Sequence, residues 1–128
     1  MSNKVKIVAD STCDLNEGLL SQYGIETIAL PVNLGDKACL DGIDVHTPDL
    51  FEYYRQTGKL PTTSAPTPAY YEEFYQKWTD EGYDIVHLSI SGEMTVTPNI
   101  ARMAAEHFPN VHPVDSRNVS SGMGFLAV

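Results

Sequence analysis

The sequence predicts an α/β fold built on a mainly parallel sheet. Short apolar runs rich in β-branched residues alternate along the chain with stretches whose apolar residues recur at helical spacing. Such alternation is typical of βαβ units, which place the carboxyl ends of parallel strands at one edge of the sheet. Three of the expected strands are followed by polar, hydroxyl-rich loops at residues 10–12, 91–97 and 115–117. Ligands bind at that edge in folds of this class, so these loops are the first candidates for a site.

The first half of the chain predicts three strands and two helices. The expected elements are a strand over 5–9, a helix over 16–23, a strand over 25–32, a strand ending near 40 and a helix over 47–58. Glycines at 24 and 58 are typical helix stops. Thr47 before Pro48 has the pattern of an N-cap followed by a first-turn proline.

The second half continues the alternation. The expected elements are a proline-rich loop over 60–68, a helix over 68–81, a strand over 84–90, a helix from 97 to 107, a strand over 111–114 and an apolar element over 120–128. Thr97 before Pro98 repeats the cap-plus-proline pattern. A stripe of aromatic residues in the 68–81 helix predicts that it packs on a core: Tyr71, Phe74, Tyr75 and Trp78.

Length and charge limit the function. The 128 residues correspond to about one domain, with 42% hydrophobic and 20% charged residues, which is globular composition. Eight basic against 17 acidic residues give a net charge of −9, which argues against nucleic acid or anionic membrane as a partner. A small anion site made of local amides is still compatible with that charge. No segment resembles a signal peptide or a membrane span, so we expect a cytoplasmic protein with Cys13 and Cys39 reduced.

The last nine residues have the pattern of a polar turn that leads into an apolar element, with no C-cap glycine, basic turn or polar tail after it. A finished domain seldom ends on its own apolar run. We therefore expect residues 1–128 to be the front part of a longer protein.

Two loops carry groups that could bind a carboxylate or phosphate. In the 60–68 loop, prolines restrict the chain beside Thr63 and Ser64, so their hydroxyls would lose little entropy on binding. In the 91–97 loop, Ser91, Gly92 and Thr95 offer hydroxyls and a close backbone approach. The alternative interpretation of both loops is structural: Thr67 and Thr97 cap the helices that follow, and the remaining residues form turns.

Catalytic and metal patterns are weak. Asp10 follows the first strand, where an aspartyl nucleophile could lie, but Thr12 stands where a haloacid-dehalogenase-like phosphatase has its second Asp. The simpler interpretation is that Asp10 holds a loop. The cysteines and histidines lack metal-ligand spacing, and no general base stands beside a nucleophile, so we expect no metal and no cofactor. A binding protein is favoured over an enzyme.

Five short segments carry a family pattern: VADSTCDL at 8–15, LDGID at 40–44, TSAPTP at 63–68, LSIS at 88–91 and VDSRNVS at 114–120. In this order they resemble the DegV family of bacterial fatty-acid-binding proteins over essentially the whole chain. The resemblance implies a three-layer αβα N-terminal domain over residues 1–128, followed in the family by a second domain that this chain lacks. It also implies that a long-chain fatty acid is bound and presented to a separate kinase subunit, which phosphorylates the carboxylate. The family member is then a carrier and not the catalyst.

The resemblance places a head-group hydroxyl on Thr63 and a second one in the loop after the LSIS strand. There the family has a serine where this chain has Gly92, so only a backbone N–H is available unless Ser91 or Thr95 supplies the hydroxyl. Basic and imidazole partners would come from the second domain. At about 0.8 kcal/mol per buried CH₂, the tail would supply most of the affinity, and the head-group bonds would fix orientation.

Two other functions remain open at this point. One is a phosphate-ester hydrolase that uses Asp10 as its nucleophile. The other is a structural or regulatory α/β module with no ligand.

Overall fold

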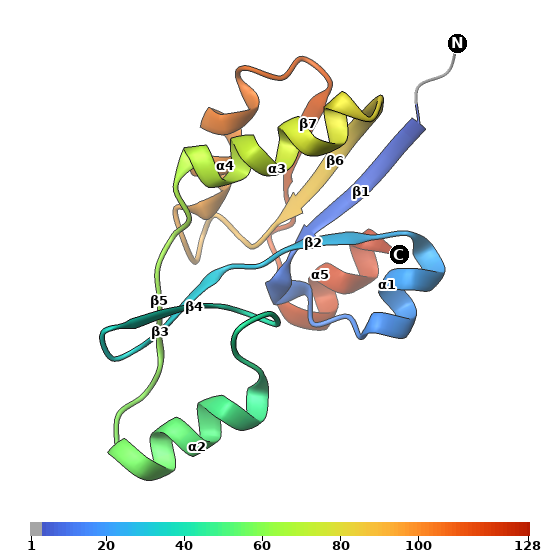
Figure 1. Cartoon of the computed structure of the whole chain (residues 1–128). Helices are drawn as coiled ribbons and strands as arrows, with labels where there is room; N and C mark the ends of the chain where they lie inside the picture. Colours follow the sequence, from blue (N-terminus) through green and yellow to red (C-terminus); the bar gives the residue numbers. More distant parts are fainter. Residues whose placement is uncertain (1–3) are drawn as a thin grey trace. The chain divides into compact units, whose positions relative to one another are not determined.

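The computed structural model describes residues 4–128 and is a mixed α/β structure with a mainly parallel sheet, as predicted (Figure 1). The described chain forms two compact units. The first contains the described residues through Ile28 together with Pro66–Val128, and the second is Ala29–Ala65.

The first unit is built on four parallel strands in the order β2-β1-β6-β7. Their bounds are β1 Lys4–Asp10, β2 Glu26–Ile28, β6 Tyr83–Ser89 and β7 Val111–Asp115. Because β1, β6 and β7 are parallel neighbours, their carboxyl ends lie at one edge of the sheet, as the sequence predicts.

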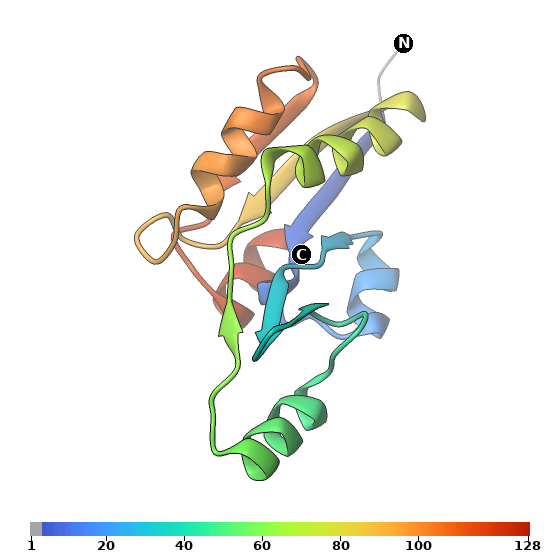
Figure 2. The same ribbon diagram turned by 60° about the vertical axis from the view of Figure 1, so that its left-hand side comes forward.

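Helices cover both faces of this sheet and make three layers (Figures 1 and 2). On one face lie α3 (Pro68–Asp80) and α4 (Thr97–Ala105); the other carries α5 (Ser120–Ala127), α1 (Glu17–Tyr23) and the short 3₁₀ turn η1 (Ser11–Cys13). The first face has a core of Val8, Ile28, Tyr71, Tyr75, Ile85, Ala101, Ala104 and Val111. The second has a core of Ala9, Cys13, Ile25, Leu88, Met123 and Ala127. Neighbouring β1 residues Val8 and Ala9 belong to different cores, as strand alternation requires.

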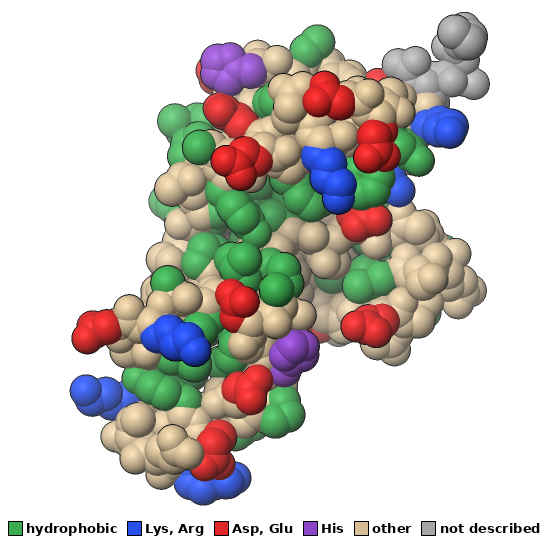
Figure 3. Space-filling view, viewed as in Figure 1, with side chains coloured by type: hydrophobic (Ala, Val, Ile, Leu, Met, Phe, Trp, Pro, Cys, Tyr) green, Lys and Arg blue, Asp and Glu red, His purple; other side chains and the backbone are tan. Residues whose placement is uncertain are grey.

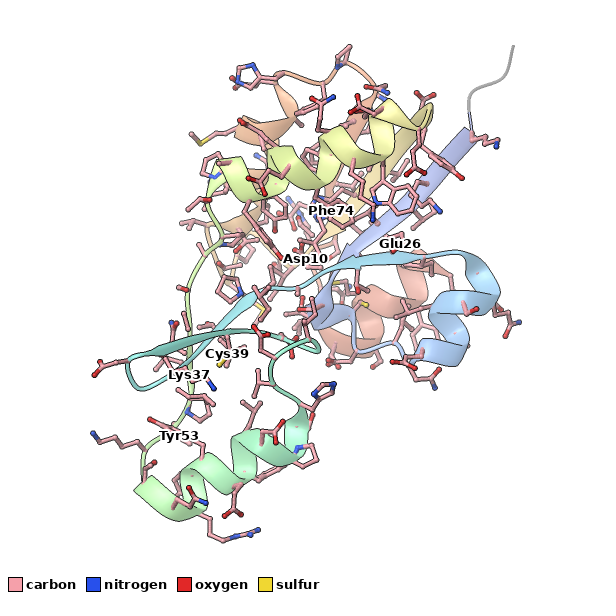
Figure 4. The ribbon with its side chains drawn as sticks, in the orientation of Figure 1. Asp10, Glu26, Lys37, Cys39, Tyr53 and Phe74 are labelled. Carbon is pink, nitrogen blue, oxygen red and sulfur yellow. The ribbon has the colours of Figure 1, made fainter. Side chains whose placement is uncertain are left out.

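The second unit is a small antiparallel sheet with one helix. The strands lie in the order β4-β3-β5, with bounds β3 Pro31–Leu34, β4 Lys37–Leu40 and β5 Thr62–Thr63, and the helix is α2, Thr47–Thr57. Val32, Cys39 and Val45 form its core, against which Leu34 and Leu50 pack. Figure 4 labels Lys37 and Cys39 on β4 and Tyr53 on α2. Gly35, with φ 64°, supplies the left-handed turn between β3 and β4.

Two strand expectations are wrong in detail. Residues 25–32 do not form one strand: β2 ends at Ile28 and belongs to the parallel sheet, whereas β3 begins at Pro31 and belongs to the antiparallel one. Proline has no N–H to donate to a continued ladder, which fits its place as the first residue of β3. The 60–68 segment is also not entirely loop, because Thr62 and Thr63 pair with β3.

Helix starts were predicted with mixed success. Asn16 and Thr67 cap α1 and α3 by accepting from the N–H groups of Leu19 and Tyr70. Thr47 and Thr97 are not caps but the first residues of their helices. At α2 the cap is His46, whose N–H donates to the Asp49 carboxylate at 2.8 Å.

At α4 the preceding residue, Val96, already has helical angles, so the cap lies earlier than the pattern indicates. Instead of capping the helix, the Thr97 hydroxyl pairs with that of Thr95. Within residues 4–128, no helix is both long and apolar enough to cross a bilayer.

Candidate functional site

The loops after β6 and β7 are joined by backbone hydrogen bonds in the first unit. Ser91 N–H donates to the Asn118 carbonyl at 3.0 Å, and Ser116 N–H donates to the Ser89 carbonyl at 3.1 Å. These two bonds close the sheet edge immediately beyond the last ladder pair, Ser89 with Asp115. The loops at 91–97 and 115–117 therefore meet, as expected from parallel strand order.

Asp10 joins the end of β1 to the same edge (Figure 4). Its side chain is fully buried, and Oδ2 accepts the N–H of Ile90 at 3.0 Å. Oδ1 accepts the Tyr71 hydroxyl at 2.9 Å and lies 2.8 Å from Nε2 of His87. Since Ile90 is the first residue after β6, this carboxylate fixes the start of the 91–97 loop. The interpretation that Asp10 holds a loop is confirmed.

A buried chain of side chains continues from Asp10 into α3. His87 is fully buried, and its Nδ1 lies 2.6 Å from the Tyr75 hydroxyl. Every group is satisfied when Nε2–H of His87 donates to Asp10 and the Tyr75 hydroxyl donates to Nδ1. Burial, reinforced by the Asp10 carboxylate, raises the pKa of both the Tyr71 and Tyr75 phenols, so they stay protonated donors. The set Asp10, Tyr71, Tyr75 and His87 is called the buried network below.

Sequence reasoning missed this network, although it contained signals for it. The tyrosines are four residues apart, so they lie on one face of α3, and they were assigned only to the core. His87 is a polar residue inside an apolar strand, two positions from Ile85, which is a signal for a buried polar partner. What could not be read from the sequence is that Tyr71 and His87 both bind Oδ1 of Asp10, which is 61 and 77 positions away in the chain.

The predicted loop residues Ser91, Gly92 and Thr95 lie between β6 and α4. Ser91 is buried, and its Oγ accepts the N–H of Glu93 at 3.2 Å. The Thr95 hydroxyl lies 3.0 Å from that of Thr97, at the beginning of α4. Gly92 is exposed and contributes a backbone N–H. The loop thus holds the hydroxyls of Ser91 and Thr95 and the backbone amide of an exposed glycine at the end of a strand, the donor types that bind a carboxylate.

The Gly92 amide already has an acceptor. It donates to both oxygens of Asp115, each at 3.1 Å, and Arg117 N–H donates to Oδ1 of the same carboxylate at 2.9 Å. The Arg117 and Gly92 amides lower the pKa of Asp115. A Cβ added at Gly92 would lie 2.6 Å from Oδ2 of Asp115, so a serine there requires Asp115 to move.

Thr63 and Ser64 lie in the second unit, and both are exposed. In the register of the sheet Thr63 is opposite Val32, which is in turn opposite Cys39, so the three share one face. Ser64 N–H donates to the Pro31 carbonyl at 3.4 Å. Both hydroxyls are therefore carried by ordered backbone at the edge of the small sheet.

The space-filling view shows several acidic side chains, in red, over α3, with lysines and arginines lying singly among the acidic residues (Figure 3). A groove of about 560 Å³ lies against α3 and the residues after α4, and it is lined in part by Glu72, Glu73 and Asp80. Its carboxylates disfavour an anionic ligand. Among residues 4–128 no group of His, Cys, Asp and Glu is arranged to hold a metal ion, and Cys13 and Cys39 are buried free thiols.

The family described as "Uncharacterised protein, DegV family" matches residues 4–128. The chain belongs to the DegV family. A DegV domain-containing protein of Clostridium perfringens is 32% identical over 126 residues, which are 97% of this chain and 45% of that protein. A second from Clostridium acetobutylicum is 36% identical over 127 residues, 98% of this chain and 46% of that protein. The chain therefore spans just under half the length of these curated relatives.

Solved structures of DegV proteins have the same fold. A structure described as fatty acid binding of a DegV family protein from Thermus thermophilus has a TM-score of 0.87 at 31% identity, covering 97% of this chain and 45% of that one. A stearic acid-binding protein from Eubacterium ventriosum has a TM-score of 0.86 at 26% identity, covering 95% and 44%. The three-layer αβα fold with a mainly parallel sheet, implied by the sequence resemblance, is thus confirmed.

Proposed function

We propose that this chain binds a long-chain fatty acid and holds its carboxylate through the hydroxyl-rich loops. The observation that carries the proposal is the loop after β6, where the hydroxyls of Ser91 and Thr95 lie on either side of Gly92 in the sequence at the carboxyl edge of a parallel sheet. Family membership supports the ligand class, because the structural relatives from Thermus thermophilus and Eubacterium ventriosum are described as binding fatty acid and stearic acid.

Thr63 and Ser64 are proposed as further head-group donors. Each is exposed, and the β3–β5 pairing limits the backbone freedom of Thr63. A hydrogen bond to a charged group is worth about 1.5–3 kcal/mol, so a few such bonds orient the carboxylate, while an apolar tail supplies most of the binding free energy. The resemblance also implies basic and imidazole groups in a second domain, and we propose that they bind the same carboxylate.

The proposed role is that of a carrier which presents the acyl carboxylate to a separate fatty-acid kinase subunit for acyl-phosphate formation. The chain's own side chains support this division of labour. Asp10, the candidate nucleophile of the hydrolase alternative, is buried with both oxygens hydrogen-bonded, so it is not placed to attack a substrate. The hydrolase alternative required Asp10 to act as a nucleophile, so the structure does not support it. We propose the cytoplasm as the compartment, where Cys13 and Cys39 would stay reduced.

A Thr63→Val substitution tests the head-group assignment. It removes one hydroxyl without changing side-chain size, and we expect it to raise the dissociation constant of oleic acid at least about tenfold. Thr62→Val is the matched control, because Thr62 is the exposed neighbour in β5 that faces the opposite side of the strand. Equal affinities of the Thr63→Val, Thr62→Val and unmodified proteins in equilibrium dialysis would refute the role of Thr63.

A further inference from the structure

The carboxylate of Asp115 is bound by the backbone in the manner expected for a ligand carboxylate. Both of its oxygens accept the Gly92 N–H, and Oδ1 also accepts the Arg117 N–H. Arg117 has φ 51°, a left-handed conformation that is uncommon for a residue other than glycine. The segment after β7 is thus held in an unfavourable backbone conformation while its amide donates to this carboxylate.

A local turn explains only part of this arrangement. The bond from Arg117 N–H to Asp115 joins residues two apart, which is an ordinary Asx-turn. The contact with Gly92 spans 23 residues and joins two loops at the candidate site. The Gly92 amide can approach the Asp115 carboxylate to 3.1 Å because glycine has no side chain. A Cβ at position 92 would lie 2.6 Å from Oδ2 of Asp115.

The Asp115 carboxylate therefore places a negative charge on the Gly92 amide. The resemblance assigns position 92 to head-group binding. Two cations, Arg102 and Arg117, act on Asp115 and favour its ionised form. An approaching carboxylate meets the hydroxyls of Ser91 and Thr95 in a loop whose Gly92 amide already binds the Asp115 carboxylate, and that carboxylate repels a second negative charge. An uncharged head group can use the same hydroxyls without that repulsion.

We propose that Asp115 is a specificity-determining residue of the fatty acid site, where its carboxylate occupies the Gly92 amide and weakens the preference for an ionised over an uncharged head group. This inference rests on the proposed function and extends it to head-group selectivity. It also bears on the glycine at position 92, because a Cβ there would lie 2.6 Å from Oδ2 of Asp115 and the carboxylate would have to shift to accept a serine.

The test compares oleic acid with oleyl alcohol, which have the same tail, in the complete gene product and its Asp115→Asn variant. The amide oxygen of asparagine can still accept from Gly92 and Arg117, so the loop is kept while the charge is removed. We expect the dissociation constant of oleic acid to fall about five- to tenfold and that of oleyl alcohol to change by less than about twofold. Glu93→Gln, which removes a charge from the same loop without touching this contact, is expected to leave the ratio of the two constants unchanged.

A second variant moves the Asp115 carboxylate without removing its charge. Gly92→Ser should displace Asp115 and shift the ratio in the same direction, and combining it with Asp115→Asn should give less than the sum of the two effects. An acid-to-alcohol ratio that is the same in Asp115→Asn and the unmodified protein would overturn the inference while leaving fatty acid binding intact. Failure of every form to bind either lipid would overturn the proposed function and the inference together.

Discussion

Replacing Asp10 with alanine is expected to lower the free energy of unfolding by about 3–5 kcal/mol. The substitution removes the acceptor of three donors: the N–H of Ile90, the hydroxyl of Tyr71 and Nε2–H of His87. An unsatisfied buried donor costs about 1–3 kcal/mol, and the Tyr71 and His87 side chains are fully buried, so neither donor can turn toward solvent. Urea unfolding followed by circular dichroism measures the change.

Asn at the same position makes the test sharper. Asp10→Asn keeps the size and one oxygen but turns an NH₂ group toward a donor, so we expect a loss of about 2 kcal/mol. The matched control is Asp14→Asn, since Asp14 is exposed and its φ of 53° is tolerated by asparagine. A loss below about 1 kcal/mol for Asp10→Ala would contradict the buried network as a stabilising unit.

Gly124→Ala is expected to destabilise the protein by about 2 kcal/mol, although alanine is the better helix former. A Cβ at this position in α5 would lie 2.9 Å from the backbone oxygen of Cys13 and 2.8 Å from Cδ2 of Leu15. The oxygen belongs to the backbone of η1, so the clash cannot be relieved by rotating a side chain. The helix would have to move away from the core it shares with Ala9 and Leu88.

The control for this prediction lies one half-turn away in the same helix. At Gly122 a Cβ would meet only the side chain of Asn118, which can rotate, so Gly122→Ala should change stability by less than about 1 kcal/mol. Thermal unfolding of both variants gives the comparison. Equal melting temperatures for Gly122→Ala and Gly124→Ala would contradict the close packing of α5 on η1.

Much of the first unit could be predicted because its signals are local. Apolar runs bounded by turns located β1, β6 and β7 within one or two residues, and glycine stops located the ends of α1 and α2. The meeting of the 91–97 and 115–117 loops followed from parallel strand order alone. Periodicity could not show that residues 25–32 divide between two sheets, because both pieces are equally apolar and β-rich.

The sequence could indicate candidate residues for the site but not the contacts that they make. Sequence patterns pointed to Ser91, Gly92 and Thr95, and the structure places them in one loop. The pairing of Gly92 with Asp115 depends on two segments 23 residues apart, and no local pattern encodes it. In the same way, Asp10 drew notice as a possible nucleophile, whereas its burial and its three partners give it a positioning role.

The roles proposed for the loop hydroxyls and for Asp115 all require that the protein holds a long-chain fatty acid. The most direct measurement is native mass spectrometry of the complete gene product, followed by organic extraction and identification of the released lipid. We predict a bound species whose mass is that of a long-chain fatty acid, and binding of added oleic acid at micromolar concentration. A lipid-free protein that also fails to bind added oleic acid at that concentration would contradict the proposed function.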